Sequence, residues 1–152
     1  MKYPLRFIDG KHYKNINHKK YKYELLETYR ILCPDYISVR FTGLNQYPEC
    51  IANEWFSFLP TKEGVYLCAK KGYCWDGASG PTWDDKTNMR ASLVHDCFWQ
   101  AIDEKILGRL FIQPSNKFFK EILIEDGMWK FRANYYYWVV NNPLVIRWKL
   151  GK

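Results

Sequence analysis

Hydrophobic and polar residues alternate with a period of two in the first half of the chain, the pattern of half-buried β-strands. The runs are Ile37, Val39 and Phe41; Val65, Leu67 and Ala69; and a short aromatic run of Trp55, Phe56 and Phe58. Residues 21–32 leave helix and strand open, because their apolar residues have helical spacing while their Tyr and Thr content suits a strand. We therefore expect several strands before residue 70.

The second half changes to the period of an α-helix. Thr87 or Asn88 can cap a helix that runs to about Asp103. A second helix opens at Pro114–Ser115 and stops at Asp126–Gly127. A third carries Met128, Phe131, Tyr135 and Trp138 and ends near residues 141–143. Strands followed by helices, without β-α-β alternation, predict an α+β fold: N-terminal antiparallel strands and a C-terminal bundle of about three helices.

The positive charge of the chain is concentrated at the N-terminus. The net charge of the 152 residues is +7, and residues 1–22 hold seven basic residues against one acid. We therefore expect a basic N-terminal arm, residues 1–22, and a single domain, residues 23–152. Aromatic residues alternate with Lys11, Lys14, Lys19 and Lys20, which suits phosphate contacts and base stacking in nucleic acid. The alternative is a solvated tail.

Cysteine usage and hydropathy limit the compartment. Five cysteines without a C-x-x-C pair support neither a zinc ribbon nor a secreted disulfide framework. The start of the chain has no signal-peptide pattern, and no apolar stretch is long enough to span a membrane. We expect a cytoplasmic protein with reduced thiols, neither secreted nor membrane-spanning.

The candidate chemistry lies in residues 72–102, between the two halves. On a helix over residues 88–103, His95 falls between an apolar arc and a polar stripe that contains Asp96 and Asp103. Burial and a nearby carboxylate tune an imidazole near neutrality, as a general base requires. The alternative is a structural histidine that ties the helix to a loop carbonyl.

The preceding loop, Asp76–Pro81, has the composition of a tight turn whose backbone groups point inward. Gly77, Ala78 and Gly80 would shape such a turn, which can hold a cation or an oxyanion. Hard oxygen ligands for Ca²⁺ or Mg²⁺ are offered by Asp76 and Asp96, and also by Asp84 and Asp85. Ser79 is a candidate nucleophile, although position 81 is Pro where a nucleophile elbow has Gly. The alternative is a structural turn capped by Asp76.

These motifs together resemble a phage- and prophage-associated family of unknown function, marked by a D-G-A-S turn and a helix with H-D-x-L-Y. The turn is residues 76–79, and residues 95–99 read His-Asp-Cys-Phe-Trp. Residues 115–123 and 127–133 match two further helical motifs, so the resemblance covers residues 36–140. Asn116 departs from it, because the family has Asp there. Asn116 can orient a histidine but cannot stabilise an imidazolium as a carboxylate does, and Asp103 is a candidate substitute.

A second, looser resemblance is to calcium-loop phospholipases. Residues 73–77 and 93–97 echo their glycine-rich loop and their helical His-Asp pair, although this chain lacks their many cysteines. The resemblance implies that His95 activates water and that Asp96 binds calcium. We therefore expect a phage-encoded hydrolase of a small-molecule or lipid substrate in the host cytoplasm. The alternative is a non-enzymatic phage protein, either a virion component or an accessory factor that binds a host molecule or nucleic acid.

Overall fold

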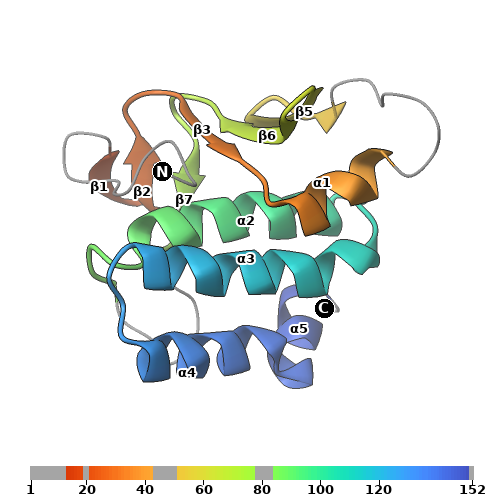
Figure 1. Ribbon diagram of the computed structural model, residues 1–152. Coiled ribbons are helices and arrows are strands. Elements are labelled where there is room, and N and C mark those ends of the chain that lie inside the picture. The colour runs from red at the N-terminus through yellow and green to blue at the C-terminus, as the bar shows by residue number, and fades with distance from the viewer. Residues whose placement is uncertain (1–12, 19–20, 43–50, 78–83, 151–152) are drawn as a thin grey trace. The chain divides into compact units, whose positions relative to one another are not determined.

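The computed structural model describes residues 13–18, 21–42, 51–77 and 84–150. The chain divides into two compact units, Met1–Trp75 and Asp76–Lys152. All strands of the described residues belong to the first unit, whereas the second is helical (Figure 1). The predicted α+β class, with antiparallel strands before the helices, is confirmed.

The first sheet of the strand-rich unit is made by β1 (Tyr13–His18), β2 (Tyr21–Leu25) and β7 (Cys74–Trp75), in the order β1-β2-β7. Both pairings are antiparallel. The rings of Tyr13 and Tyr23 pack on the buried Trp75, with centroids 5.9 and 5.5 Å from it. Residues 21–25, left open between helix and strand by the sequence, are therefore a strand.

This sheet includes part of the segment that we assigned to a basic arm. Lys14 lies opposite Glu24 in the β1–β2 register, and its Nζ is 3.0 Å from Glu24 Oε2. A cross-strand ion pair partly offsets the charge that would face a phosphate. Lys11, Lys19 and Lys20 lie outside the described residues. An arm boundary at residue 22 would fall within β2, because Tyr21 and Tyr23 both belong to that strand.

The second sheet has the order β3-β6-β5-β4. Its strands are β3 (Tyr29–Leu32), β4 (Ile51–Ala52), β5 (Phe56–Thr61) and β6 (Gly64–Ala69). Val65, Leu67 and Ala69 of β6 are buried, as the alternation predicted, and so are Phe56 and Phe58 of β5. The strands predicted at these two places are confirmed.

The strand predicted for residues 37–41 is wrong, since these residues lie in the helix α1 (Asp35–Thr42). Ile37 and Phe41 are four residues apart and share one buried helical face, while Val39 on the opposite side is 58% exposed. The Ser38 hydroxyl donates a hydrogen bond to the Cys33 carbonyl and accepts one from the Val65 N–H. Short apolar alternation could not distinguish this helix from a strand, and the contact with β6 decides it.

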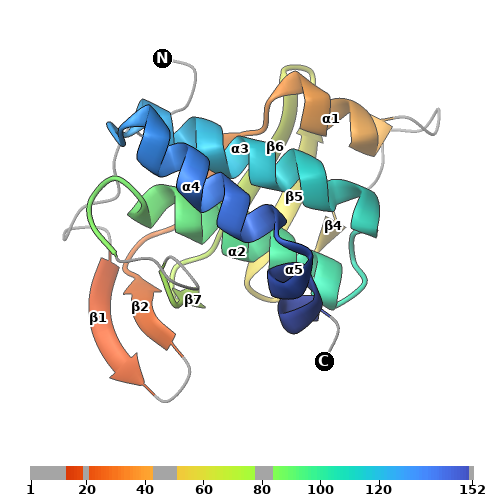
Figure 2. The same ribbon diagram turned by 90° about the horizontal axis from the view of Figure 1, so that it is seen from below.

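The helical unit contains α2 (Met89–Asp103), a 3₁₀ turn (Arg109–Phe111), α3 (Ile112–Glu125), α4 (Lys130–Asn141) and α5 (Pro143–Leu150). The end of α2 at Asp103 is confirmed, and α3 and α4 occupy the places of the other two predicted helices. The sequence analysis missed α5, which begins at a proline that ends one helix and starts the next. Within this unit α3 packs against both α2 and α4 (Figures 1 and 2).

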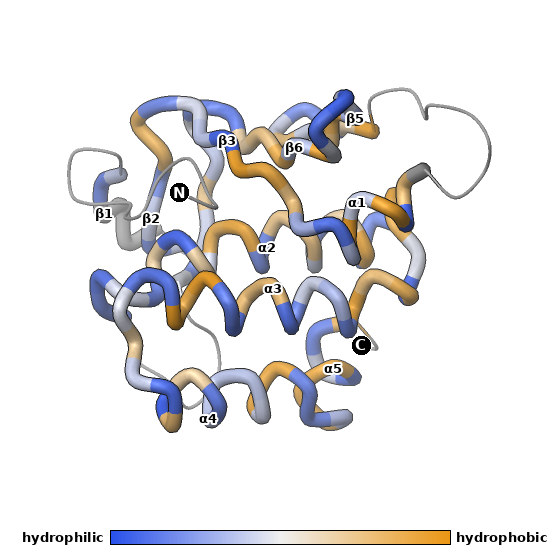
Figure 3. Tube along the Cα trace, viewed as in Figure 1, coloured by the Kyte–Doolittle hydropathy of each residue, from blue (hydrophilic) through white to orange (hydrophobic). Residues whose placement is uncertain are grey.

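Apolar residues recur along α2 and α3 with helical spacing (Figure 3), and both helices bury most of them. A buried ion pair adds to this packing: Arg90 at the start of α2 donates two hydrogen bonds to Asp126, which follows α3. None of the described helices is both long and apolar enough to cross a membrane.

Candidate functional site

The site is centred on His95, near the middle of α2. The imidazole is buried, with 3% of the residue exposed, and Nε2 lies 2.6 Å from Oδ1 of Asn116 on α3. The rings of Trp99 and Phe119 pack beside it, with centroids 5.2 and 4.7 Å from its own. The predicted proximity of His95 and Asn116 is therefore present in the structure, and the bonded edge of the ring faces an amide.

The hydrogen bonds of Asn116 fix the tautomer of His95. Asn116 Oδ1 also accepts a hydrogen bond from the Trp99 indole N–H at 3.2 Å. Asn116 Nδ2 donates to the Val140 carbonyl and to Asn141 Oδ1, at 3.3 and 2.9 Å. An indole N–H only donates and a carbonyl only accepts, so the amide has one satisfactory orientation. His95 must then carry its proton on Nε2, which leaves the lone pair on Nδ1.

The surroundings keep this imidazole neutral. Burial lowers the pKa of His95 well below its usual 6.5, and the positive charge of Lys149 lowers it further. The hydrogen bond to Asn116 acts in the opposite direction on the pKa but does not outweigh burial. At neutral pH the ring therefore holds an unprotonated Nδ1. Among the described residues, none donates a hydrogen bond to that nitrogen.

Asp96 is half-buried and accepts a hydrogen bond from the backbone N–H of Asp76. Burial raises the pKa of Asp96 from 3.8 to about 7, and the negative charges of Asp76 and Asp84 add to this rise. Lys149 and the Asp76 N–H partly offset it. Asp96 is thus a carboxyl group that exchanges a proton near neutral pH, next to the histidine in sequence.

Lys149 of α5 completes the cluster, and the sequence analysis missed it. Its Nζ lies 5.1 Å from the centroid of the Trp99 ring. Burial lowers the pKa of Lys149, while the charges of Asp96 and Asp76 raise it. The sequence offered no reason to place Lys149 at the site, because α5 was not predicted. The direction of the chain after α4 could not be inferred from the sequence either. One ammonium group thus lies within electrostatic reach of both carboxylates and of His95.

Gly77 confirms part of the predicted loop. Its φ is +79°, a left-handed conformation that favours glycine, and a Cβ there would overlap the Asp84 carboxylate. Ala78, Ser79 and Gly80 lie outside the described residues, so their expected roles stay predictions.

The metal ligands expected from the sequence, Asp76 and Asp96, do lie near one another. Among the described residues, however, no group of three or more His, Cys, Asp or Glu side chains is arranged to hold a metal ion. Ca²⁺ takes six to eight oxygen ligands. Lys149 already places a positive charge near the two carboxylates, and a Ca²⁺ or Mg²⁺ site here stays a prediction.

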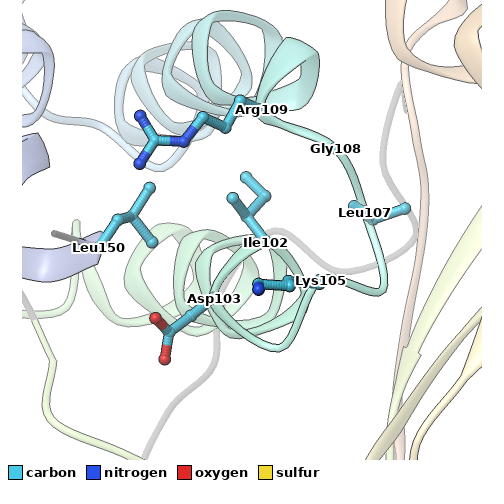
Figure 4. Close-up of a pocket in the computed structure, with 7 residues that line it drawn as sticks. All are labelled: Ile102, Asp103, Lys105, Leu107, Gly108, Arg109 and Leu150. Carbon is cyan, nitrogen blue, oxygen red and sulfur yellow. The ribbon is translucent and has the colours of Figure 1, made fainter.

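Asp103, the predicted substitute for the missing acid, lies elsewhere. It is exposed at the end of α2 and helps to line a pocket of about 260 Å³ (Figure 4). The other lining residues are Ile102, Lys105, Leu107, Gly108, Arg109 and Leu150. The nitrogen that an acid would orient, His95 Nε2, is already bonded to Asn116, so the structure gives Asp103 no part in holding the imidazole.

No protein-family model, no curated protein and no solved structure matches this chain. The functional argument therefore depends on the geometry of the cluster formed by His95, Asp96, Asn116, Asp76 and Lys149.

Proposed function

We propose that this chain is a phage-encoded hydrolase in which His95 is the general base. One observation carries the proposal: Asn116 holds the proton of a neutral imidazole on Nε2 and so keeps the lone pair on Nδ1. A general base must be unprotonated at the working pH and must present a defined nitrogen. The lowered pKa of His95 and its fixed tautomer support such a role.

Four residues of the cluster have separate roles in the proposed reaction. His95 Nδ1 takes a proton from water as the water oxygen bonds to the electrophilic centre of the substrate, and it returns that proton to the leaving group. The Lys149 ammonium stabilises the negative charge that develops on the substrate oxygen. Asp96, with a pKa of about 7, shares protons with the same site. Asn116 touches no reacting atom and is a positioning residue.

The Asn116 amide limits the rate of such an enzyme. An amide fixes the tautomer but adds no negative charge to balance the imidazolium that forms during the reaction. Lys149 raises the cost of that imidazolium further. We therefore expect a slow hydrolase whose rate increases when residue 116 carries a carboxylate.

The test compares wild type with His95→Gln on p-nitrophenyl esters, phospholipid vesicles and nucleotides. Glutamine can donate to Asn116 Oδ1 as His95 Nε2 does, so the variant should fold, while the base is absent. We expect hydrolysis to fall at least about a hundredfold, the lower end of what a general base contributes. Assays with EDTA, Ca²⁺ or Mg²⁺ ask whether a metal participates. Full activity in folded His95→Gln would contradict the proposal.

A non-enzymatic role is the second candidate, and the burial of His95 supports it. The ring packs between two aromatic residues, and Asn116 uses all four of its hydrogen bonds to join α2, α3 and α4. A structural histidine would look the same. Measuring the protein in purified phage particles separates a virion component, present in fixed stoichiometry, from an accessory factor that is absent from them.

A further inference from the structure

The outer side of α4 carries a second apolar face. α3 packs on one side of α4, where Ala133, Tyr136 and Val140 are buried. Phe131, Tyr135 and Trp138, spaced by four and three residues, share another face and are 69%, 40% and 62% exposed. Figure 2 shows α4 and α5 on the near side of the helical unit. A helix at the surface of a protein ordinarily has one apolar face, and α4 has two.

Further exposed apolar side chains lie before and after these three residues in the chain. Trp129 precedes α4, is 72% exposed, and its ring centroid lies 5.5 Å from that of Phe131. Leu144 and Trp148 are four residues apart on α5 and are 75% and 72% exposed. Single exposed apolar residues are normal, but a group of them on neighbouring helices marks an interaction site. We call these six residues the aromatic face: Trp129, Phe131, Tyr135, Trp138, Leu144 and Trp148.

A groove opens at one end of the aromatic face. It has a volume of about 700 Å³ and a mainly apolar lining. Its walls are Thr87, Gly127, Met128, Trp129, Phe131, Arg132 and Tyr135. The groove offers room for an apolar group inserted beside the exposed rings.

The segment that carries the aromatic face contains basic residues and no acidic residue. Residues 127–152 include Lys130, Arg132, Arg147, Lys149 and Lys152. Arg132 is paired with Asp85, and Lys149 belongs to the His95 cluster. Lys130 and Arg147 are exposed and directly precede Phe131 and Trp148 in the chain. Exposed Trp and Phe combined with Lys and Arg, on helices too short to cross a bilayer, are typical of a segment that lies in the membrane interface.

We propose that the aromatic face binds the surface of an anionic lipid bilayer. Its indole and phenyl rings enter the interfacial region, while Lys130 and Arg147 contact acidic headgroups. Lipid fits better than nucleic acid, because Leu144 is as exposed as the rings and has no surface for stacking on a base. This binding depends on Trp129 and on exposed side chains of α4 and α5, none of which belongs to the His95 cluster. It goes beyond the proposed hydrolase, so it holds with or without activity.

The test is sedimentation with phosphatidylcholine vesicles, with and without phosphatidylglycerol. We expect binding to the anionic vesicles that weakens as salt is added. Trp138→Ala should weaken it about tenfold, by loss of buried apolar area, and Lys130→Gln about fivefold, by loss of one charge. Trp55→Ala and Lys62→Gln are matched controls, because both residues are exposed in the strand-rich unit.

Quenching of tryptophan fluorescence by brominated lipid locates the contact. The quenched fraction should be larger in wild type than in the Trp129→Phe/Trp138→Phe/Trp148→Phe variant, which lacks the three indoles of the aromatic face. Failure to bind anionic vesicles would overturn the proposal, and so would equal losses in the face variants and their controls. Tight binding to single-stranded DNA without vesicle binding would assign the face to nucleic acid instead. Self-association that Trp138→Ala abolishes, again without vesicle binding, would assign it to a second copy of this chain. His95→Gln should bind vesicles normally, which separates this result from the outcome of the hydrolase test.

Discussion

Asn116 has two tasks that place different demands on one side chain. Its oxygen accepts from His95 and Trp99, and its nitrogen donates to Val140 and Asn141. The pairing with His95 was predictable from the sequence, at a position where a family that the chain resembles has Asp. The two donated bonds could not be predicted, because they require α4 to return beside α3. The amide meets both demands, whereas a carboxylate meets only the first.

Asn116→Asp should therefore keep the acceptor for His95 and Trp99 while removing the two hydrogen bonds that Asn116 donates to α4. A carboxylate beside the imidazole should raise the His95 pKa, and the loss of two donors should lower the free energy of unfolding by about 1–3 kcal/mol. NMR titration of the His95 resonances and urea denaturation measure the two effects. Asn134→Asp, on an exposed position of α4, is the control for adding an acid. An unchanged His95 pKa would show that residue 116 does not orient the ring.

His95 and Asp96 make opposite contributions to the pH dependence of stability. The folded-state pKa of His95 is lowered, so its contribution is present above pH 6.5 and lost as the pH falls. That of Asp96 is raised from 3.8 to about 7, so its contribution is present at low pH and lost as the pH rises through this interval. Just below pH 6.5 the two slopes therefore oppose each other.

Replacing either residue should reveal how the other one makes the free energy of unfolding depend on pH. Relative to wild type between about pH 5 and pH 6, the free energy of unfolding of Asp96→Asn should rise with pH, by up to about 1.4 kcal/mol per pH unit. That of His95→Gln should fall by a similar amount. Urea denaturation at closely spaced pH values provides the measurement. Parallel curves for all three proteins would show that neither group has the shifted pKa described above.

At the scale of elements, the long helices were predictable and the short ones were not. α2 and α3 have many buried positions, so their period is visible in the sequence. α1 has eight residues and the pattern of a strand, because Ile37, Val39 and Phe41 follow a period of two and only Ile37 and Phe41 share a helical face. α5 also has eight residues, none of them fully buried, so its apolar residues show no clear period. Contacts with neighbouring elements, rather than local pattern, determine both.

The buried ion pair between α2 and the end of α3 gives a prediction at this scale. Arg90→Met would leave the Asp126 carboxylate buried without its guanidinium, which costs about 3–5 kcal/mol. Asp126→Leu should cost a similar amount, because it would leave the Arg90 guanidinium buried without its nearest carboxylate. The double variant Arg90→Met/Asp126→Leu should recover much of the loss, and urea denaturation of the four proteins completes the cycle. Additive losses in the double variant would contradict this account.

At the scale of the whole molecule, the part of the candidate site that comes from neighbouring segments of the chain could be predicted from the sequence. His95, Asp96, Asp76 and Gly77 come from adjacent segments, and the turn and helix periods bring them together. Lys149 comes from the far end of the chain, and its place depends on how three helices pack. A lysine in a short amphipathic stretch has the same local pattern whether it faces a carboxylate or solvent. Its charge nevertheless alters the pKa of both His95 and Asp96.

The two bonds from Asn116 Nδ2 to α4 have a mechanical consequence. Together with the Trp99 N–H they prevent the amide from rotating, so the tautomer of an imidazole on α2 depends in part on where the end of α4 lies. If α4 moved away by the length of a hydrogen bond, the Trp99 N–H alone would keep the amide oxygen towards the imidazole. The packing of α4 thus contributes to the stability of the Nε2 tautomer on another helix.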